Sequence, residues 1–154
     1  ETAVPPQAAW EFLTQPGQRM SWQPWVTSVE IKGATGGRRG VGSANHCMHG
    51  ADAVVEEILD WRPFDYITDR TILETPDGPV SVLHTIEFEP TASGTTIHYL
   101  FGPPATPREM AAMEVIGPAY GEALRGAFPD LVSQLESEFA TRSTDRGPGP
   151  ASGG

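Results

Sequence analysis

Cysteine is almost absent from the sequence, and long apolar runs are missing altogether. The single cysteine, Cys47, cannot form a disulfide within the chain. Chains without disulfides are typical of reducing compartments, so we expect a cytoplasmic protein. No apolar run approaches the roughly 20 residues that a membrane-spanning helix needs. No basic segment followed by an apolar segment opens the sequence, so nothing in it predicts export.

Basic residues are also scarce. The chain has 10 lysines and arginines against 20 aspartates and glutamates, which gives a net charge of −10. A surface with this charge repels phosphate backbones and anionic lipid, so we expect neither a nucleic-acid partner nor a membrane-surface role. The length of 154 residues fits one domain with a single core.

The two ends of the chain differ from the rest. The extended-looking run Glu1–Val4 predicts the tail of a strand whose first part is missing, and the alternative is a trimmed or processed terminus. Residues 141–154 include no large apolar side chain, so this segment cannot offset the entropy lost on ordering. We therefore predict one domain over residues 1–140 and a disordered tail over 141–154. Other domains of a longer chain are then candidate partners.

Two short helices and six strands are predicted before residue 102. One helix follows Pro5 and Pro6, and a second short turn covers Trp22 to Trp25. From Val26 onwards apolar residues alternate with period two between turn residues, which is typical of strands. The predicted strands are Val26–Lys32, Val41–His49, Ala53–Trp61, Tyr66–Leu73, Val80–Glu89 and Thr95–Phe101. Because the connections are short, we expect an antiparallel meander.

A long helix is predicted after the strands. Thr106, Pro107 and Glu109 form a capping-box pattern, which marks the start of a helix. Apolar residues then recur every three or four positions as far as Phe139, so one face of this helix packs against the sheet. Pro118 and Pro129 predict that the helix over Pro107 to Phe139 is interrupted into two or three pieces.

The order of these elements, together with several short motifs, resembles the START/polyketide-cyclase (SRPBCC) superfamily. The motifs are Val4–Thr14, Trp22–Val26, Val41-Gly42, and Phe88-Glu89-Pro90 followed by Gly94-Thr95. The resemblance implies an α+β helix-grip fold: a curved antiparallel sheet of six to seven strands around a long C-terminal helix, with two short N-terminal helices. It also implies a cavity between sheet and helix that suits an apolar or aromatic ligand. The superfamily has no shared catalytic residues, so the resemblance implies no reaction.

A more local resemblance concerns the segments His46–Gly50 and Asp60–Tyr66. The amino-acid sequences of these segments are similar to those of SRPBCC domains in multidomain bacterial proteins, including proteins with nucleotide-cyclase modules.

Histidine and cysteine cluster in one predicted strand. His46 faces away from Cys47 and His49 because successive strand residues alternate. One strand therefore offers at most two metal ligands, and His84 could add a third, whereas zinc needs three or four. We expect no metal and no cofactor. The glycines between Gly33 and Gly42 predict a hairpin turn, because no helix follows them to hold a phosphate.

The last predicted hairpin supplies the wall of the expected cavity. Its more apolar face comprises Val82, His84, Ile86, Phe88, Ile97, Tyr99 and Phe101, and His98 points to solvent. A few polar groups in an apolar wall orient a small ligand, although His84 and Tyr99 could instead only satisfy buried hydrogen bonds. With the helix stripe and the tryptophans of the short helices, the predicted ligand-binding residues are Trp22, Trp25, His84, Ile86, Tyr99, Phe101, Met113 and Tyr120.

Two adjacent carboxylates, Glu56 and Glu57, cannot both face solvent on a strand. The inward one would have a raised pKa suited to acid–base chemistry, unless Arg70 pairs with it.

Three functions remain open at this point. The first is binding of a small hydrophobic or aromatic molecule as a carrier, sensor or regulatory module. The second is a cyclase/dehydratase-like enzyme that uses His84, Tyr99 or an inward glutamate. The third is a protein-interaction domain like the chaperone-activating branch of the superfamily. A cavity of several hundred Å³ with converging polar groups would favour a ligand, and a filled interior would favour a protein partner.

Overall fold

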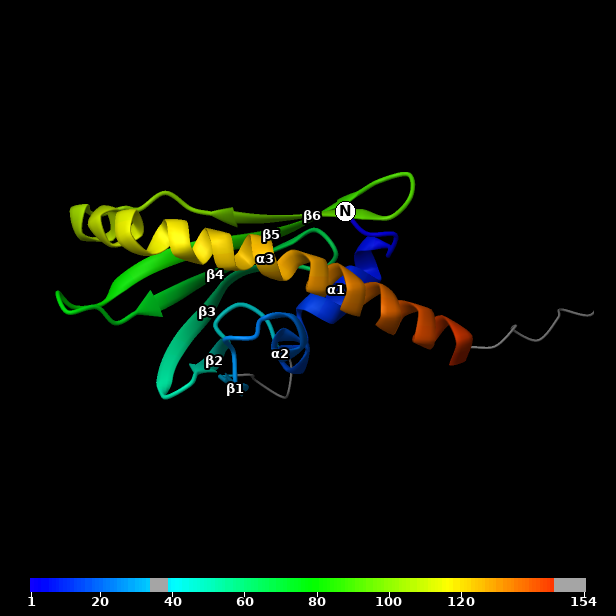
Figure 1. Cartoon of the computed structure of the whole chain (residues 1–154), viewed down its shortest axis with the longest axis horizontal. Helices are drawn as coiled ribbons and strands as arrows, with labels where there is room; N and C mark the ends of the chain where they lie inside the picture. The colour runs from blue at the N-terminus through cyan, green and yellow to red at the C-terminus, as the bar shows by residue number, and fades with distance from the viewer. Residues whose placement is uncertain (34–38, 146–154) are drawn as a thin grey trace, which may run out of the picture.

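The structure is a computed structural model that describes residues 1–33 and 39–145 (Figure 1). One antiparallel sheet forms its centre, and the strands lie side by side in chain order. They are β1 (Ser28–Lys32), β2 (Ala44–His49), β3 (Asp52–Arg62), β4 (Tyr66–Leu73), β5 (Val80–Pro90) and β6 (Thr95–Phe101). The predicted six-stranded meander is confirmed.

Short helices precede the sheet, namely α1 (Pro6–Leu13), η1 (Pro16–Gln18) and α2 (Arg19–Trp22). The prediction placed the second of two short helices at Trp22 to Trp25, but α2 ends where that segment begins. The reason is Pro24, which disfavours the helical conformation at the residue before it. Gln23 is accordingly extended, with φ −108° and ψ 91°.

Two strands start later than predicted. β1 begins at Ser28 rather than Val26, and β2 begins at Ala44 rather than Val41. A turn delays β2, because Gly42 has φ +83° and the amide of Ser43 donates to the carbonyl of Gly40 at 3.0 Å. Residues 34–38 of the predicted glycine turn lie outside the described residues.

The C-terminal helix α3 (Pro107–Asp145) is longer and more regular than predicted. Its capping box is confirmed: Thr106 Oγ1 accepts from the amide of Glu109 at 3.2 Å, and Glu109 Oε2 accepts from the amide of Thr106 at 2.9 Å. The expected interruption is wrong, since Pro118 and Pro129 lie inside one helix. Both prolines are exposed, so water can satisfy the carbonyls that lose their intrahelical partner.

The predicted tail also starts too early. Residues 141–145 continue α3, and residues 146–154 lie outside the described residues.

The extended segment at the N-terminus adds an isolated antiparallel bridge to the edge strand β6. Thr2 and Thr95 exchange two backbone hydrogen bonds of 3.0 Å each. Gly94 allows this approach, because a Cβ at that position would lie 2.0 Å from the carbonyl oxygen of Thr2.

Helix α3 lies across one face of the sheet and its C-terminal end extends beyond the strands, and α1 and α2 pack at the end where its C-terminal half lies (Figure 1). That end is filled by apolar side chains. They include Leu124, Ala127, Leu131 and Leu135 of α3, together with Trp10, Phe12, Trp22, Ile58, Ile86 and Phe88. No helix among the described residues is long and apolar enough to cross a membrane.

The filled end provides a test of the packing. Leu131 is 2% exposed, whereas Val115 in the same helix is 78% exposed. We expect Leu131→Ala to lower the free energy of unfolding by about 2–5 kcal/mol, because it leaves a hole in a closed core. The control Val115→Ala should change it by less than about 0.5 kcal/mol. Urea denaturation of both variants measures the difference, and equal effects would contradict this account of the core.

Candidate functional site

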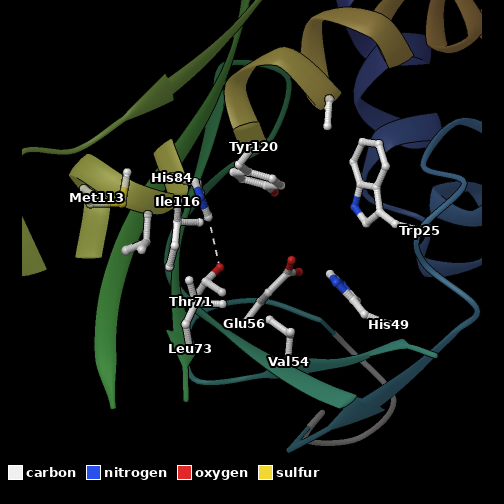
Figure 2. A pocket seen from close by; sticks show the side chains of 12 residues that line it. Trp25, His49, Val54, Glu56, Thr71, Leu73, His84, Met113, Ile116 and Tyr120 are labelled. Carbon is white, nitrogen blue, oxygen red and sulfur yellow. Dashed lines mark hydrogen bonds between the residues drawn. The ribbon is translucent and has the colours of Figure 1, made fainter. Parts of the chain in front are cut away.

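A cavity of about 360 Å³ lies between the sheet and the N-terminal half of α3 (Figure 2). Its wall is mainly apolar, with a few polar groups. The lining residues are Trp25, His49, Val54, Glu56, Thr71, Leu73, Val82, His84, Met113, Ile116, Tyr120 and Ala123. The fold is thus filled at one end of α3 and hollow at the other.

Four of the eight predicted ligand-binding residues line this cavity: Trp25, His84, Met113 and Tyr120. They come from the loop after α2, from β5 and from the apolar stripe of α3. The structure brings these three elements around one space.

The other four predicted residues do not line it. Trp22 and Ile86 are 3% and 5% exposed and belong to the apolar core. Phe101 lies at the end of the edge strand β6 and is 38% exposed. Tyr99 faces inward but packs behind His84, with ring centroids 5.6 Å apart. The strand alternation therefore identified the correct face, but the prediction extended the cavity too far along it.

An aromatic cluster holds the His84 ring in place. The rings of Phe101, Tyr99 and Tyr120 have centroids 5.0, 5.6 and 6.0 Å from it. Burial raises the pKa of Tyr99, and it raises the pKa of Tyr120 to about 12. Both hydroxyls therefore keep their protons near neutral pH.

The sequence analysis did not predict the part of the wall that comes from β2, β3 and β4. The side chains concerned are His49, Val54, Glu56, Thr71 and Leu73. The register explains their meeting, because Glu56 pairs with Thr71 and Thr71 pairs with Val82 across three strands. The sequence held a signal for these residues. Extending the inward face of the last hairpin to the residues that pair with it on the neighbouring strands would have identified them.

Glu56 is the inward carboxylate, and its partner is Arg19 of α2 rather than Arg70. Arg70 instead pairs with Glu57, whose side chain is 41% exposed. Asn45 Nδ2 donates a second hydrogen bond to Glu56 Oε2 at 3.2 Å. Burial by itself would raise the pKa of Glu56, but the charge and hydrogen bond of Arg19 outweigh it and lower the pKa. Of the two alternatives that the sequence left open, a raised pKa or pairing with an arginine, the structure shows pairing, with Arg19 in place of Arg70, and Glu56 is ionised near neutral pH.

Cys47 is fully buried beside this ion pair. Arg19 Nη1 donates to its sulfur at 3.4 Å. Burial raises the pKa of Cys47 to about 11, so the thiol stays protonated and is a poor nucleophile.

A second buried polar group surrounds His84. Its Nδ1 lies 3.3 Å from Asp69 Oδ1 and 3.1 Å from Thr71 Oγ1, and Figure 2 draws the bond to Thr71. Burial raises the pKa of Asp69, and the hydrogen bond from His84 opposes that shift. Nε2 of His84 is buried and has no hydrogen-bond partner among the described residues.

His49 lies across the cavity from His84 (Figure 2). Burial lowers its pKa, which favours the neutral imidazole. Within the described part of the chain, no three His, Cys, Asp or Glu side chains are close enough together to hold a metal ion.

Comparisons with known proteins agree with this architecture. Residues 1–136 match the family model described as polyketide cyclase / dehydrase and lipid transport. No curated protein matches the chain.

Solved structures share the fold at low sequence identity. Protein NE0264 of Nitrosomonas europaea is similar with a TM-score of 0.69 and 20% identity, over 91% of this chain and 92% of that one. Ara h 8.0201 gives a TM-score of 0.62 and 17% identity, over 88% and 92% of the two chains. DynU16, from the dynemicin biosynthetic locus, gives 0.60 and 18%, over 89% of this chain and 45% of its own. The helix-grip fold predicted from the sequence is confirmed.

The buried thiol leads to a simple test of the site's polar interior. We expect iodoacetamide at about pH 8 to leave Cys47 unmodified in the folded protein, because its pKa of about 11 and its burial suppress the thiolate. The same reagent should modify the thiol completely in guanidinium chloride. Intact-mass spectrometry measures both states, and full alkylation of the folded protein would contradict the arrangement.

Proposed function

The chain belongs to the polyketide cyclase / dehydrase and lipid transport family, and on this basis we propose that it binds a small apolar or aromatic molecule in the cavity under α3. The role within a cell would be that of a carrier, a sensor or a regulatory module. Four residues predicted from the sequence, Trp25, His84, Met113 and Tyr120, would contact the ligand.

The cavity is the observation that carries this proposal. Its volume of about 360 Å³ falls in the range of small-molecule sites, which are mostly apolar with a few placed polar groups. Trp25 and Tyr120 offer ring faces, and Met113 offers an adaptable, polarisable side chain. A molecule with two or three fused rings would match this wall.

The hollow interior favours a ligand over a protein partner. An interaction domain needs no cavity, and a space of this size inside the fold removes packing contacts that would otherwise stabilise it. DynU16, which is similar in fold, comes from a biosynthetic locus, and this supports a small-molecule role.

Catalysis is the second candidate, and the arrangement at His84 favours it. Asp69 and Thr71 hold Nδ1 on one side of the ring, and Nε2 has no hydrogen-bond partner in the part of the chain that the structure describes. An imidazole oriented in this way can remove a proton from a carbon next to a ligand carbonyl. The protonated hydroxyl of Tyr120 could donate to the carbonyl oxygen.

Ligand binding can be tested with two substitutions at adjacent residues of β3, of which only one reduces the volume of the cavity. Val54 lines the cavity, whereas Val55, the next residue of β3, does not. We expect 2-naphthol to bind the wild-type protein with one-to-one stoichiometry in isothermal titration calorimetry. Val54→Trp should weaken binding at least about tenfold, because the indole ring takes up volume that the ligand would otherwise fill. Val55→Trp is the matched control and should bind like wild type; equal losses in both variants would refute the site.

The catalytic candidate has a separate test. If His84 acts as a base, the protein should accelerate deuterium exchange at the acidic carbon of 2-tetralone in D₂O, followed by proton NMR. His84→Asn retains a donor for Asp69 but lacks Nε2, so exchange should fall to the buffer rate. His98→Asn is the control, because His98 is on the outer face and pairs with Glu89 at 3.0 Å. Exchange at the buffer rate with the wild-type protein would exclude this activity for the probe.

A further inference from the structure

We propose that the cavity selects its ligand by hydrogen-bond donors: it takes an apolar, ring-sized molecule that carries a hydroxyl or an amine N–H, and it rejects carboxylates. The inference rests on the proposed function, because it names the class of ligand that the same cavity binds.

Glu56 is the first reason. Its carboxylate projects from β3 into the space between Tyr120 and His49 (Figure 2). The hydrogen bonds from Arg19 and Asn45 both reach Oε2. Neither Arg19 nor Asn45 donates to the second oxygen, Oε1, so we take it as the acceptor that a ligand would reach, and an ionised carboxylate can only accept hydrogen bonds.

His84 is the second reason. In the tautomer in which Nδ1–H donates to Asp69 Oδ1, Nε2 carries the lone pair and can accept a hydrogen bond. Its side chain is 3% exposed, and Nε2 finds no partner among the described residues. A buried polar atom without a partner is unfavourable, so a donor from a ligand would satisfy it.

The absence of a cation from the wall is the third reason. Among residues 1–33 and 39–145, neither a lysine nor an arginine lines the cavity. Arg19 lies behind Glu56, with which it is paired, and burial favours the neutral form of His49. A ligand carboxylate would therefore lie against the carboxylate of Glu56 and find no free cation to pair with, because Arg19 is already paired. The net charge of −10 acts in the same direction at longer range.

These features together define a ligand class. Phenols, alcohols and amines on a fused-ring body supply a donor to Glu56 or His84 while the rings contact Trp25 and Met113. A hydrogen bond to a charged, buried acceptor discriminates strongly against an analogue that lacks the donor.

Three naphthalene derivatives test the proposal on the wild-type protein by isothermal titration calorimetry. 2-Naphthol has the O–H, 2-methoxynaphthalene keeps the oxygen without its hydrogen, and 2-naphthoate is an anion. We expect 2-naphthol to bind about tenfold more tightly than the methyl ether, the value of one hydrogen bond to a charged group. We expect 2-naphthoate to bind more weakly than either.

A pair of variants on adjacent residues locates the effect. Glu56→Gln removes the charge and should reduce the preference for 2-naphthol over the ether to less than about threefold, and it should improve binding of 2-naphthoate. Glu57→Gln is the control, because Glu57 pairs with Arg70 outside the cavity, and it should keep the wild-type order. If Glu56→Gln does not fold, the double variant Arg19→Gln/Glu56→Gln removes both buried charges and serves the same purpose.

The outcomes separate the two proposals. Equal binding of 2-naphthol and its ether, or tightest binding of 2-naphthoate, would overturn the donor rule while cavity binding stands, provided that Val54→Trp still weakens it. Failure of all three compounds to bind would overturn both. An unchanged ligand order in the variant without the Glu56 charge would also overturn the donor rule.

Discussion

The ion pair between Arg19 and Glu56 is the interaction on which the rest of the site depends. It joins the short helix α2 to β3 and lies beside Cys47 of β2. Removing two charges from water is expensive, and such a pair contributes little net stability. Loss of one partner alone, however, costs about 3–5 kcal/mol, because the other charge is left buried without compensation. The pair therefore fixes where α2 meets the sheet, and with it the position of Trp25 at the cavity.

The interior has two unlike parts, and the carboxylate of Glu56 belongs to the hollow one. On one side Leu124, Leu131 and Leu135 of α3 fill the space against the sheet. On the other side the helix presents Met113, Ile116 and Tyr120, which surround a hollow. One continuous helix thus acts as core element along its second half and as the roof of a cavity along its first. Because core packing and the cavity use different halves of the helix, residues of the cavity wall can be substituted without removing the core contacts that keep the sheet folded.

The sequence was sufficient to predict the fold because its signals are local. Period-two alternation and turn residues marked the strands, and the capping box at Thr106 marked the start of α3. The cavity was predicted only in part. Alternation identified the face that holds His84, but it carries no information on where the helix packs closely, so it could not show that Ile86 and Tyr99 lie outside the cavity lining. The partner of Glu56 comes from α2, 37 positions away in the chain, and only the tertiary arrangement determines that contact.

The two prolines of α3 have a geometric consequence. Pro118 and Pro129 are separated by 11 positions, which is close to three turns of about 3.6 residues each. Both rings therefore project from the same side of the helix, and both are exposed. A proline bends a helix away from its own side, so the two bends add in one direction rather than cancelling. Because both rings lie on the exposed side of α3, the bends that they favour point towards the sheet, and neither ring takes a place among the side chains of the core.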